Sequence, residues 1–449
     1  MRVKETSDAV RKAVIYQINL RVFTKEGTIA AAEKYLPDVT ETGADIVYLC
    51  PFVEADDDPT YEYWSDRQRR SGCVNPRNPY RPMDYFKVDP EYGTLDDFKA
   101  FVNKAHELDL KVMMDLVYMH AGPTFGKRFP QFVKHGADGK PLLNGYHFCT
   151  IDFDVPELRE YLWKNMLYFV TECGIDAYRC DVGGAVPLDF WLEGVRRIRK
   201  FRPDFLMLNE HELKYRPEDQ LEAFDVNYSQ WWVMYTLRDL FAFGLPAHVL
   251  EMVWKDEHAA AENGMSLRCI EHHDTANDMY YNRVEKISSA KYEAALVLCY
   301  CIDGVPFLYN GCEYKDTSRH SIFGLKGQFT IDRSRDPSER RAFLHRLAEI
   351  HRTEKAVLYG TTRWAAHDRR ESVAAIVRSA GEEAVFCAVN LGNEKQVVHC
   401  DDFAGFNDGK VLLERGFEKK ENGFVLETNG FIVIRKGGIQ VFRDKEHKR

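Results

Sequence analysis

The segment IDAYRCDVGG, residues 175–184, places two charged residues inside what is otherwise an apolar strand. Alternate residues of a strand point to the same face, so Arg179 and Asp181 project side by side. A guanidinium next to a carboxylate has no packing role in such a strand. The pair therefore indicates a functional role, which depends on where the fold places this strand.

Seven other short apolar runs occur along the 449-residue chain, separated by segments of helix length. Strands alternating with helices are the order of an α/β fold of the (β/α)8 TIM barrel type, and continuous apolar strands fit a parallel sheet buried on both faces. The eight predicted strands cover residues 13–20, 45–51, 111–118, 176–182, 205–211, 224–228, 267–273 and 305–311. Helices are predicted over 94–109, 156–173 and 187–201 from their caps and apolar spacing.

The barrel is expected to occupy residues 1–355, with long excursions at 52–93 and 121–151. The second excursion is a short inserted subdomain after strand 3. Beyond about residue 355 the pattern changes to strands separated by Gly, Asn and Asp turns. Residues 356–449 are therefore predicted to form a C-terminal antiparallel β domain of the β-sandwich kind.

Composition narrows the class of protein. The net charge is −9 and no long basic run precedes the C-terminal tail, so neither nucleic acid nor a membrane surface is expected as a partner. The N-terminus has no apolar secretory segment, and no apolar run is long enough to span a membrane. Eleven cysteines without framework spacing or a CxxC pair indicate reduced thiols in a cytoplasmic protein and no zinc site. The oligomeric state is left open.

Carboxylates follow several of the predicted strands. In a barrel of this type, polar residues at the carboxyl ends of the strands converge on one opening. A single acid there often caps a helix or pairs with a neighbour, but three acids with an arginine are costly as architecture alone and favour a working site. The three acids are Asp181, Glu210 and Asp274, and the arginine is Arg179. The strand ends also carry Asp115, His120, His211, His272 and His273.

Glycosidic bond cleavage requires such a set. One carboxylate attacks the anomeric carbon, and a carboxylic acid protonates the leaving oxygen and then acts as a base. An arginine keeps the nucleophile ionised, and a third carboxylate favours the oxocarbenium-like transition state.

The sequence resembles the α-amylase family of retaining α-glycoside hydrolases and transglycosylases. The resemblance rests on several motifs, which occur in the family's order along nearly the whole barrel. They are YQINLRVF (16–23), NPYRPMDYFKVDPEYGTLDDF (78–98), MMDLVYMH (113–120), DFDVPELRE (152–160), AYRCDVGG (177–184), MLNEH (207–211), IEHHDT (270–275) and DGVPFLYNGCE (303–313).

The resemblance implies roles for individual residues. It makes Asp181 the nucleophile, Glu210 the acid/base and Asp274 the third carboxylate. Arg179 would hold Asp181, with Asp115 supporting Arg179. The resemblance also implies that His120 and His273 bind sugar hydroxyls and that Tyr80 stacks beneath the sugar.

Three departures from the family pattern bear on specificity and metal binding. Met119 stands where the family often has an Asn that helps bind calcium, and a thioether does not ligate a hard cation, so no metal or other cofactor is expected. DVGGAVP (181–187) lacks the Lys-His pair that many starch-cleaving members carry after the nucleophile. His272 replaces a common Asn.

The resulting expectation is a retaining α-glycosidase that acts on α-linked gluco-oligosaccharides through a covalent glycosyl-aspartate intermediate. A transglycosylase, a phosphorylase or an isomerase would use the same intermediate and differ in the acceptor. A non-catalytic carbohydrate-binding protein is the alternative of another class, against which the presence of Asp181, Glu210 and Asp274 argues.

Overall fold

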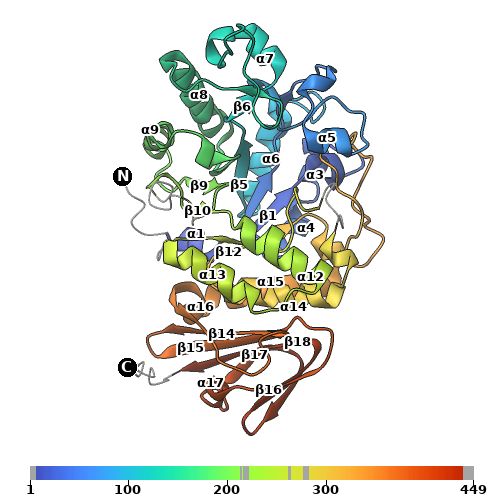
Figure 1. The fold of residues 1–449 in the computed structure, drawn as a ribbon, viewed down its shortest axis with the longest axis vertical. Helices are drawn as coiled ribbons and strands as arrows, with labels where there is room; N and C mark the ends of the chain where they lie inside the picture. Colours follow the sequence, from blue (N-terminus) through green and yellow to red (C-terminus); the bar gives the residue numbers. More distant parts are fainter. Residues whose placement is uncertain (1–6, 213–214, 216–221, 261–263, 277–282, 438–449) are drawn as a thin grey trace.

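The fold consists of a barrel with one antiparallel sheet packed beneath it (Figure 1). A computed structural model describes residues 7–212, 215, 222–260, 264–276 and 283–437. Among these residues, no helix combines the length and the apolar character that a membrane crossing requires.

Eight parallel strands form the barrel, in the spatial order β10-β9-β8-β5-β2-β1-β12-β11. A parallel bridge between Asn227 and Ser266 joins the two ends of this order and closes the ring. The predicted α/β barrel is confirmed, and each predicted strand contains one of the observed strands. These are β1 (Ile15–Ile18), β2 (Ile46–Leu49), β5 (Lys111–Leu116), β8 (Ala177–Cys180), β9 (Leu206–Asn209), β10 (Val226–Asn227), β11 (Leu267–Arg268) and β12 (Val305–Tyr309).

Helices cover the outside of the barrel. In α6 (Leu95–Glu107), Thr94 and Asp97 form a capping box, as the spacing of the two residues predicts. Helix α8 (Pro156–Tyr168) continues as a π-helical turn to Cys173 and ends at Gly174, whose φ of 76° is left-handed. The other helices are α1 (Asp8–Lys12), α2 (Leu20–Phe23), α3 (Ile29–Glu33), α4 (Leu36–Thr40), α9 (Leu188–Arg199), α11 (Gln230–Trp232), α12 (Arg238–Phe243), α13 (Val249–Ala260), α14 (Ser289–Cys301), α15 (Ser338–Thr353) and α16 (Lys355–Tyr359).

Both long excursions leave the barrel at the carboxyl ends of its strands. The first, after β2, holds the hairpin of β3 (Val53–Ala55) and β4 (Pro82–Val88) and the short helix α5 (Asp66–Arg70). The second, after β5, holds α7 (Pro123–Arg128) and the pair β6 (His120–Ala121) and β7 (Cys149–Thr150). They rise together at the top of the molecule (Figure 1).

The C-terminal strands are hydrogen-bonded into one antiparallel sheet, where the sequence predicted a sandwich. The long strand β18 makes this possible, because it pairs with β15, β16 and β17 along its length. The strands are β13 (Thr361–Trp364), β14 (Val373–Ala380), β15 (Glu383–Asn390), β16 (Gln396–His399), β17 (Lys410–Lys420) and β18 (Gly423–Gly437), with α17 (Asp401–Ala404) between β16 and β17. The boundary predicted at residue 355 stays a prediction, and residues 438–449 lie outside the described part.

Both faces of this sheet are buried, which explains its unbroken apolar strands. Along β14, Ala374 and Ile376 join the barrel's core, while Val373, Ala375 and Val377 belong to a second core on the opposite face. Alternation along a strand produces this division. The sheet is thus a structural layer against the barrel.

The half-buried carboxylate of Asp303 links the barrel to this sheet. It accepts hydrogen bonds from Trp254 Nε1 at 2.7 Å and from Thr362 Oγ1 at 2.6 Å, and His258 Nε2 lies 2.8 Å away. Arg378 of β14 lies at 3.5 Å and is itself buried. One anion therefore satisfies donors from both parts of the chain.

We expect the Asp303→Asn variant to lower the stability of the protein by about 3 kcal/mol, because it leaves a buried arginine without its counter-charge. The midpoint of thermal unfolding measures the loss. Thr361→Val, at the exposed neighbour of Thr362, is the matched control. A midpoint no lower than that of the control would contradict the role of Asp303.

Candidate active site

Adjacent strands bring the charged residues together at the carboxyl end of the barrel. Asp115 of β5 pairs in register with Arg179 of β8. Asp181 is the first residue after β8, and Glu210 is the first residue after β9. Because β5, β8 and β9 are neighbours in the sheet, these side chains share one small volume.

Arg179 binds three carboxylates at once. Its side chain is fully buried, and its Nη1 lies 2.8 Å from both Asp115 Oδ1 and Asp181 Oδ1. Its Nη2 lies 2.7 Å from Glu210 Oε2. Tyr48 supports the cluster by donating a 2.5 Å hydrogen bond to Asp115 Oδ2. The guanidinium thus fixes the nucleophile and the acid/base candidates relative to each other.

Asp181, Glu210 and Asp274, the three carboxylates that line the pocket, have different electrostatic surroundings. Burial raises the pKa of Asp181 to about 6, against the opposing charge of Arg179. Burial raises the pKa of Glu210 to about 8, where the negative charges of Asp181 and Asp274 add to the effect. Although burial also acts on Asp274, the charge of Arg67 and its hydrogen bond to this carboxylate hold the pKa of Asp274 well below the usual range. Near neutral pH, Asp181 and Asp274 are ionised while Glu210 keeps its proton.

Neutral histidines complete the polar lining. Burial lowers the pKa of His120 to about 4 and lowers the pKa of His273 well below its usual value. His120 Nε2 lies 2.8 Å from the backbone oxygen of Tyr80. His273 lies between Gln17 Nε2 at 2.8 Å and the Tyr80 hydroxyl at 2.7 Å, and its ring stacks on Tyr80. Burial thus favours the neutral form of both rings, and these contacts fix their orientation.

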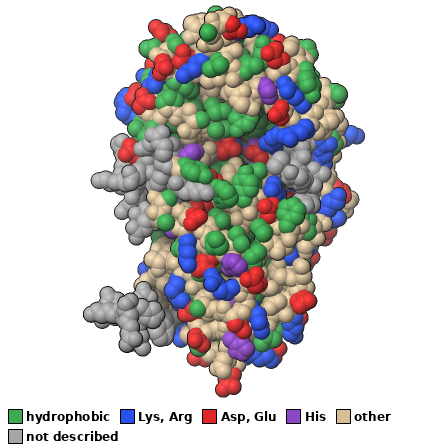
Figure 2. All heavy atoms as spheres, viewed as in Figure 1, with side chains coloured by type: hydrophobic (Ala, Val, Ile, Leu, Met, Phe, Trp, Pro, Cys, Tyr) green, Lys and Arg blue, Asp and Glu red, His purple; other side chains and the backbone are tan. Residues whose placement is uncertain are grey.

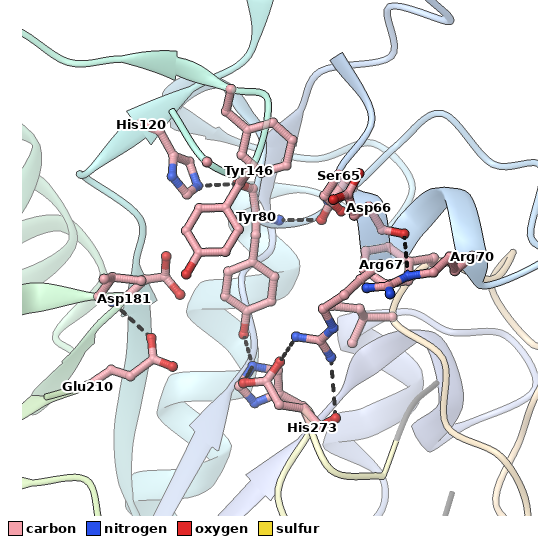
Figure 3. Close-up of a pocket in the computed structure, with 17 residues that line it drawn as sticks. Ser65, Asp66, Arg67, Arg70, Tyr80, His120, Tyr146, Asp181, Glu210 and His273 are labelled. Atoms are coloured by element: carbon pink, nitrogen blue, oxygen red, sulfur yellow. Dashed lines mark hydrogen bonds and ion pairs between the residues drawn. The ribbon is translucent and has the colours of Figure 1, made fainter. Parts of the chain in front are cut away.

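One pocket of about 290 Å³ collects these side chains (Figure 3). Arg179 lies behind the lining, where it contacts the acids rather than the open space. The predicted site residues that line the pocket are Tyr80, His120, Asp181, Glu210, His273 and Asp274.

Two parts of the lining come from the excursions and were not predicted. Arg67 and Arg70 come from α5, and Arg67 Nη1 lies 2.6 Å from Asp274 Oδ1. Tyr146, from the excursion after β5, lines the side near His120 (Figure 3). The arginine-rich DRQRR of α5 was the available signal, but nothing in its local pattern points to Asp274.

The glycines that follow Asp181 make room for the strand end that carries Glu210. A Cβ at Gly183 would lie 2.3 Å from Asn209 Oδ1, and one at Gly184 would lie 2.2 Å from His211 Nδ1. The imidazole of His211 therefore packs over Gly184. His211, from the end of the neighbouring strand, thus covers part of the segment after Asp181 that lacks the Lys-His pair.

Two places in the structure bear on metal binding: Met119, and the group formed by His272, His273 and Asp274. Met119 packs against the apolar core, so the absence of a calcium site there stays a prediction. His272, His273 and Asp274 place three possible ligand atoms within 4.8 Å of one another. However, both ring nitrogens of His273 are already engaged, and His272 Nδ1 accepts the backbone N–H of Asp274.

Comparisons with known proteins agree on one family. A family model described as the catalytic domain of alpha amylase matches residues 22–138. A cyclomaltodextrinase from Bacillus sp. is 23% identical over 414 residues, which cover 86% of this chain and 69% of that protein. An intracellular maltogenic amylase from Bacillus subtilis is 22% identical over 350 residues, which cover 71% of this chain and 57% of that protein.

The fold is shared with a solved structure over almost its whole length. A noncanonic maltogenic alpha-amylase from Thermotoga neapolitana superposes with a TM-score of 0.75 at 24% identity. The match covers 95% of this chain and 97% of that one. At this identity, the likeness concerns the fold.

We expect Arg67→Gln to lower kcat/KM for an aryl α-glucoside about 10- to 100-fold, because it removes a charge-assisted hydrogen bond that orients Asp274. Steady-state kinetics measure the effect. Arg69→Gln is the matched control, since Arg69 belongs to the same helix and its Nη2 instead binds the backbone oxygens of Tyr61 and Glu62 at 2.9 Å and 3.0 Å. Equal effects of the two substitutions would contradict a specific role for Arg67.

Proposed function

The chain belongs to the α-amylase family of glycoside hydrolases, and we propose that it cleaves α-linked gluco-oligosaccharides with retention through a glycosyl-Asp181 intermediate. The observation that carries this proposal is the fork of Arg179 between Asp181 and Glu210. Two carboxylates bound to neighbouring nitrogens of one guanidinium are held close together. This favours the separation of about 5 Å of retaining enzymes over the roughly 6.5–9.5 Å of inverting ones.

In the first half-reaction, Asp181 attacks the anomeric carbon while Glu210 gives its proton to the leaving glycosidic oxygen. Arg179 keeps Asp181 ionised, and the burial that raises the pKa of Glu210 keeps this acid protonated near neutral pH. The bond from the anomeric carbon to the leaving oxygen breaks as the ester to Asp181 forms.

In the second half-reaction, Glu210 acts as the base. It takes a proton from the incoming water, whose oxygen attacks the anomeric carbon and releases Asp181. Asp274, held by Arg67, is placed to bind hydroxyls of the sugar and to favour the positive charge of the transition state. His120 and His273, both neutral, and the Tyr80 ring are assigned to the same sugar.

The substrate class follows from the small pocket and the relatives' names. A cavity of about 290 Å³ lies at the lower end of the range for small-molecule sites. The printed names of the relatives concern cyclic maltodextrins and maltose-forming cleavage. We therefore assign short α-glucans to this chain.

A cytoplasmic location belongs to the same proposal. All eleven cysteines are buried, and none of them is in a disulfide, in keeping with a reducing compartment. One relative, the maltogenic amylase from Bacillus subtilis, is described in its name as intracellular.

The proposal is tested by incubating the protein with maltotriose, longer maltodextrins, cyclodextrins, isomaltose, sucrose and trehalose, with and without phosphate. Anomeric proton NMR identifies the linkage cleaved and the configuration of the first product. We expect cleavage of α-1,4-linked substrates with the α-anomer formed first. Initial release of the β-anomer would exclude double displacement.

Asp181→Asn is expected to lower turnover more than about a thousandfold, because an amide is a very weak nucleophile. Turnover of maltotriose measures the loss, and circular dichroism checks that the variant is folded. Asp176→Asn, a carboxylate at the opposite end of β8, is the matched control and should keep its activity. An active Asp181→Asn variant would refute the mechanism.

The pH dependence of kcat/KM is expected to be bell-shaped, with its maximum between about 6 and 8. Activity falls on the acid side as Asp181 takes up a proton, and on the alkaline side as Glu210 loses one. With α-glucosyl fluoride, whose leaving group needs no proton, the alkaline fall in the fluoride release rate should largely disappear in Glu210→Gln. A fall that persists unchanged in this variant would argue against Glu210 as its source.

A further inference from the structure

The end of the pocket that lies opposite the nucleophile and the acid is formed by the first excursion. Figure 3 shows Asp181 and Glu210 on one side of the pocket and Asp66, Arg67 and Arg70 of α5 on the other. Figure 2 shows acidic side chains inside a hollow of the molecule, with basic side chains beside it. The pocket thus extends from the two carboxylates to α5.

This direction decides which end of a sugar chain would reach α5. In the proposed reaction the anomeric carbon, C1, lies at Asp181 and Glu210, because one attacks it and the other protonates its leaving oxygen. In an α-1,4-linked chain the preceding unit is attached at C4, which lies across the pyranose ring from C1. The preceding units of a substrate would therefore point toward α5.

Two arginines of α5 stand in this direction. Arg67 Nη1 lies 2.6 Å from Asp274 Oδ1, and its Nη2 donates to the backbone oxygen of Asp274 at 3.3 Å. Attachment of a planar guanidinium at two points restricts its rotation, so Arg67 is held at the end of the pocket. Arg70 lies one helical turn further on, and its Nε donates to the backbone oxygen of Asp66 at 3.2 Å. Among the described residues, nothing pairs with the Nη groups of Arg70.

Buried side chains fix the backbone that carries α5. Gln68 is fully buried, and its Nε2 donates to the backbone oxygens of Asn75 at 2.9 Å and of Pro76 at 3.3 Å. Arg81 is also fully buried and donates to four backbone oxygens within residues 56–76, at 2.8–3.0 Å. These internal hydrogen bonds hold α5 in place without any contribution from a bound sugar.

Two other segments meet α5 at the same end of the pocket. His147 Nε2, from the excursion after β5, lies 3.3 Å from Asp66 Oδ1. Arg319, from the segment after β12, donates to the backbone oxygen of Ser71 at 2.6 Å, and Phe323 of the same segment lines the pocket. Three segments that are far apart in the sequence therefore come together where a longer chain would have to pass.

We propose that α5 closes the pocket after a single glucosyl unit, so that the protein acts only at the non-reducing ends of α-glucans and removes one unit at a time. This rests on the proposed function. Arg67 and Arg70 determine the specificity, because their side chains occupy the place of the preceding unit. The Nη groups of Arg70 supply donors for the 4-hydroxyl that only a terminal unit carries. Cyclic glucans, which have no such end, would not be substrates.

The experiment compares two forms of 4-nitrophenyl α-maltopentaoside with the full-length protein. In one form the non-reducing end is free, and in the other its 4- and 6-hydroxyls are joined in an ethylidene acetal. Chromatography measures how fast each compound is consumed and which nitrophenyl fragment appears first. We expect nitrophenyl maltotetraoside as the first fragment from the free form, and consumption of the blocked form at least about fiftyfold more slowly, because the acetal clashes with the arginines.

The double variant Arg67→Ala/Arg70→Ala should raise the ratio of blocked to free consumption about tenfold or more, and fragments shortened by two or more units should then appear among the first products. Arg128→Ala is the matched control, an exposed arginine of α7 outside the pocket lining, and its ratio should equal that of the wild type. The ratio compares two substrates of one preparation, so a partial loss of folded or active enzyme does not change it.

Equal consumption of the two forms by the wild type, or removal of two or more units first, would overturn the closed end. An unchanged ratio in the double variant would overturn the role of the two arginines. The proposed function fails separately, if neither form is consumed and the wild type releases fluoride from α-glucosyl fluoride no faster than Asp181→Asn.

Discussion

The fully buried guanidinium of Arg179 is the constraint around which the carboxyl end of the barrel is organised. A charge removed from water needs partners close by, and loss of one partner from a buried pair typically costs several kcal/mol. Here the partners come from three adjacent strands or their ends: Asp115, Asp181 and Glu210. The same contacts that satisfy the arginine therefore fix the relative positions of the two groups that chemistry requires.

Sharing one cation among three acids also separates their protonation states. Burial and neighbouring carboxylates raise the pKa of all three, but Arg179 donates hydrogen bonds to Asp115 and Asp181, so Glu210 holds its proton to a higher pH. Asp274 has its own arginine, Arg67, and differs accordingly. Under the proposed function, similar side chains would therefore take the roles of nucleophile, acid and anionic sugar ligand because their neighbours differ.

The strands and their terminal charges were predictable because both depend on local pattern. Apolar runs mark buried parallel strands, and the residues directly after them, such as Asp181 and Glu210, necessarily lie at one end of the barrel. The contact between Arg67 and Asp274 was not predictable, because it joins residues 207 positions apart through an excursion without periodicity. The C-terminal sheet shows a similar limit: its strands are evident in the sequence, but the pairing of β18 with three partners depends on tertiary packing.

The backbone between nucleophile and acid shows how tightly the two strand ends are coupled. Val182, directly after Asp181, has a φ of 42°, a left-handed conformation that is strained for a β-branched residue. Its N–H donates a 2.8 Å hydrogen bond to Glu210 Oε2, the same oxygen that contacts Arg179. The turn thus leads the chain away from the barrel while binding the acid, and the two glycines that follow allow Asn209 and His211 to approach. The stretch VGG is therefore shaped by the neighbouring strand end.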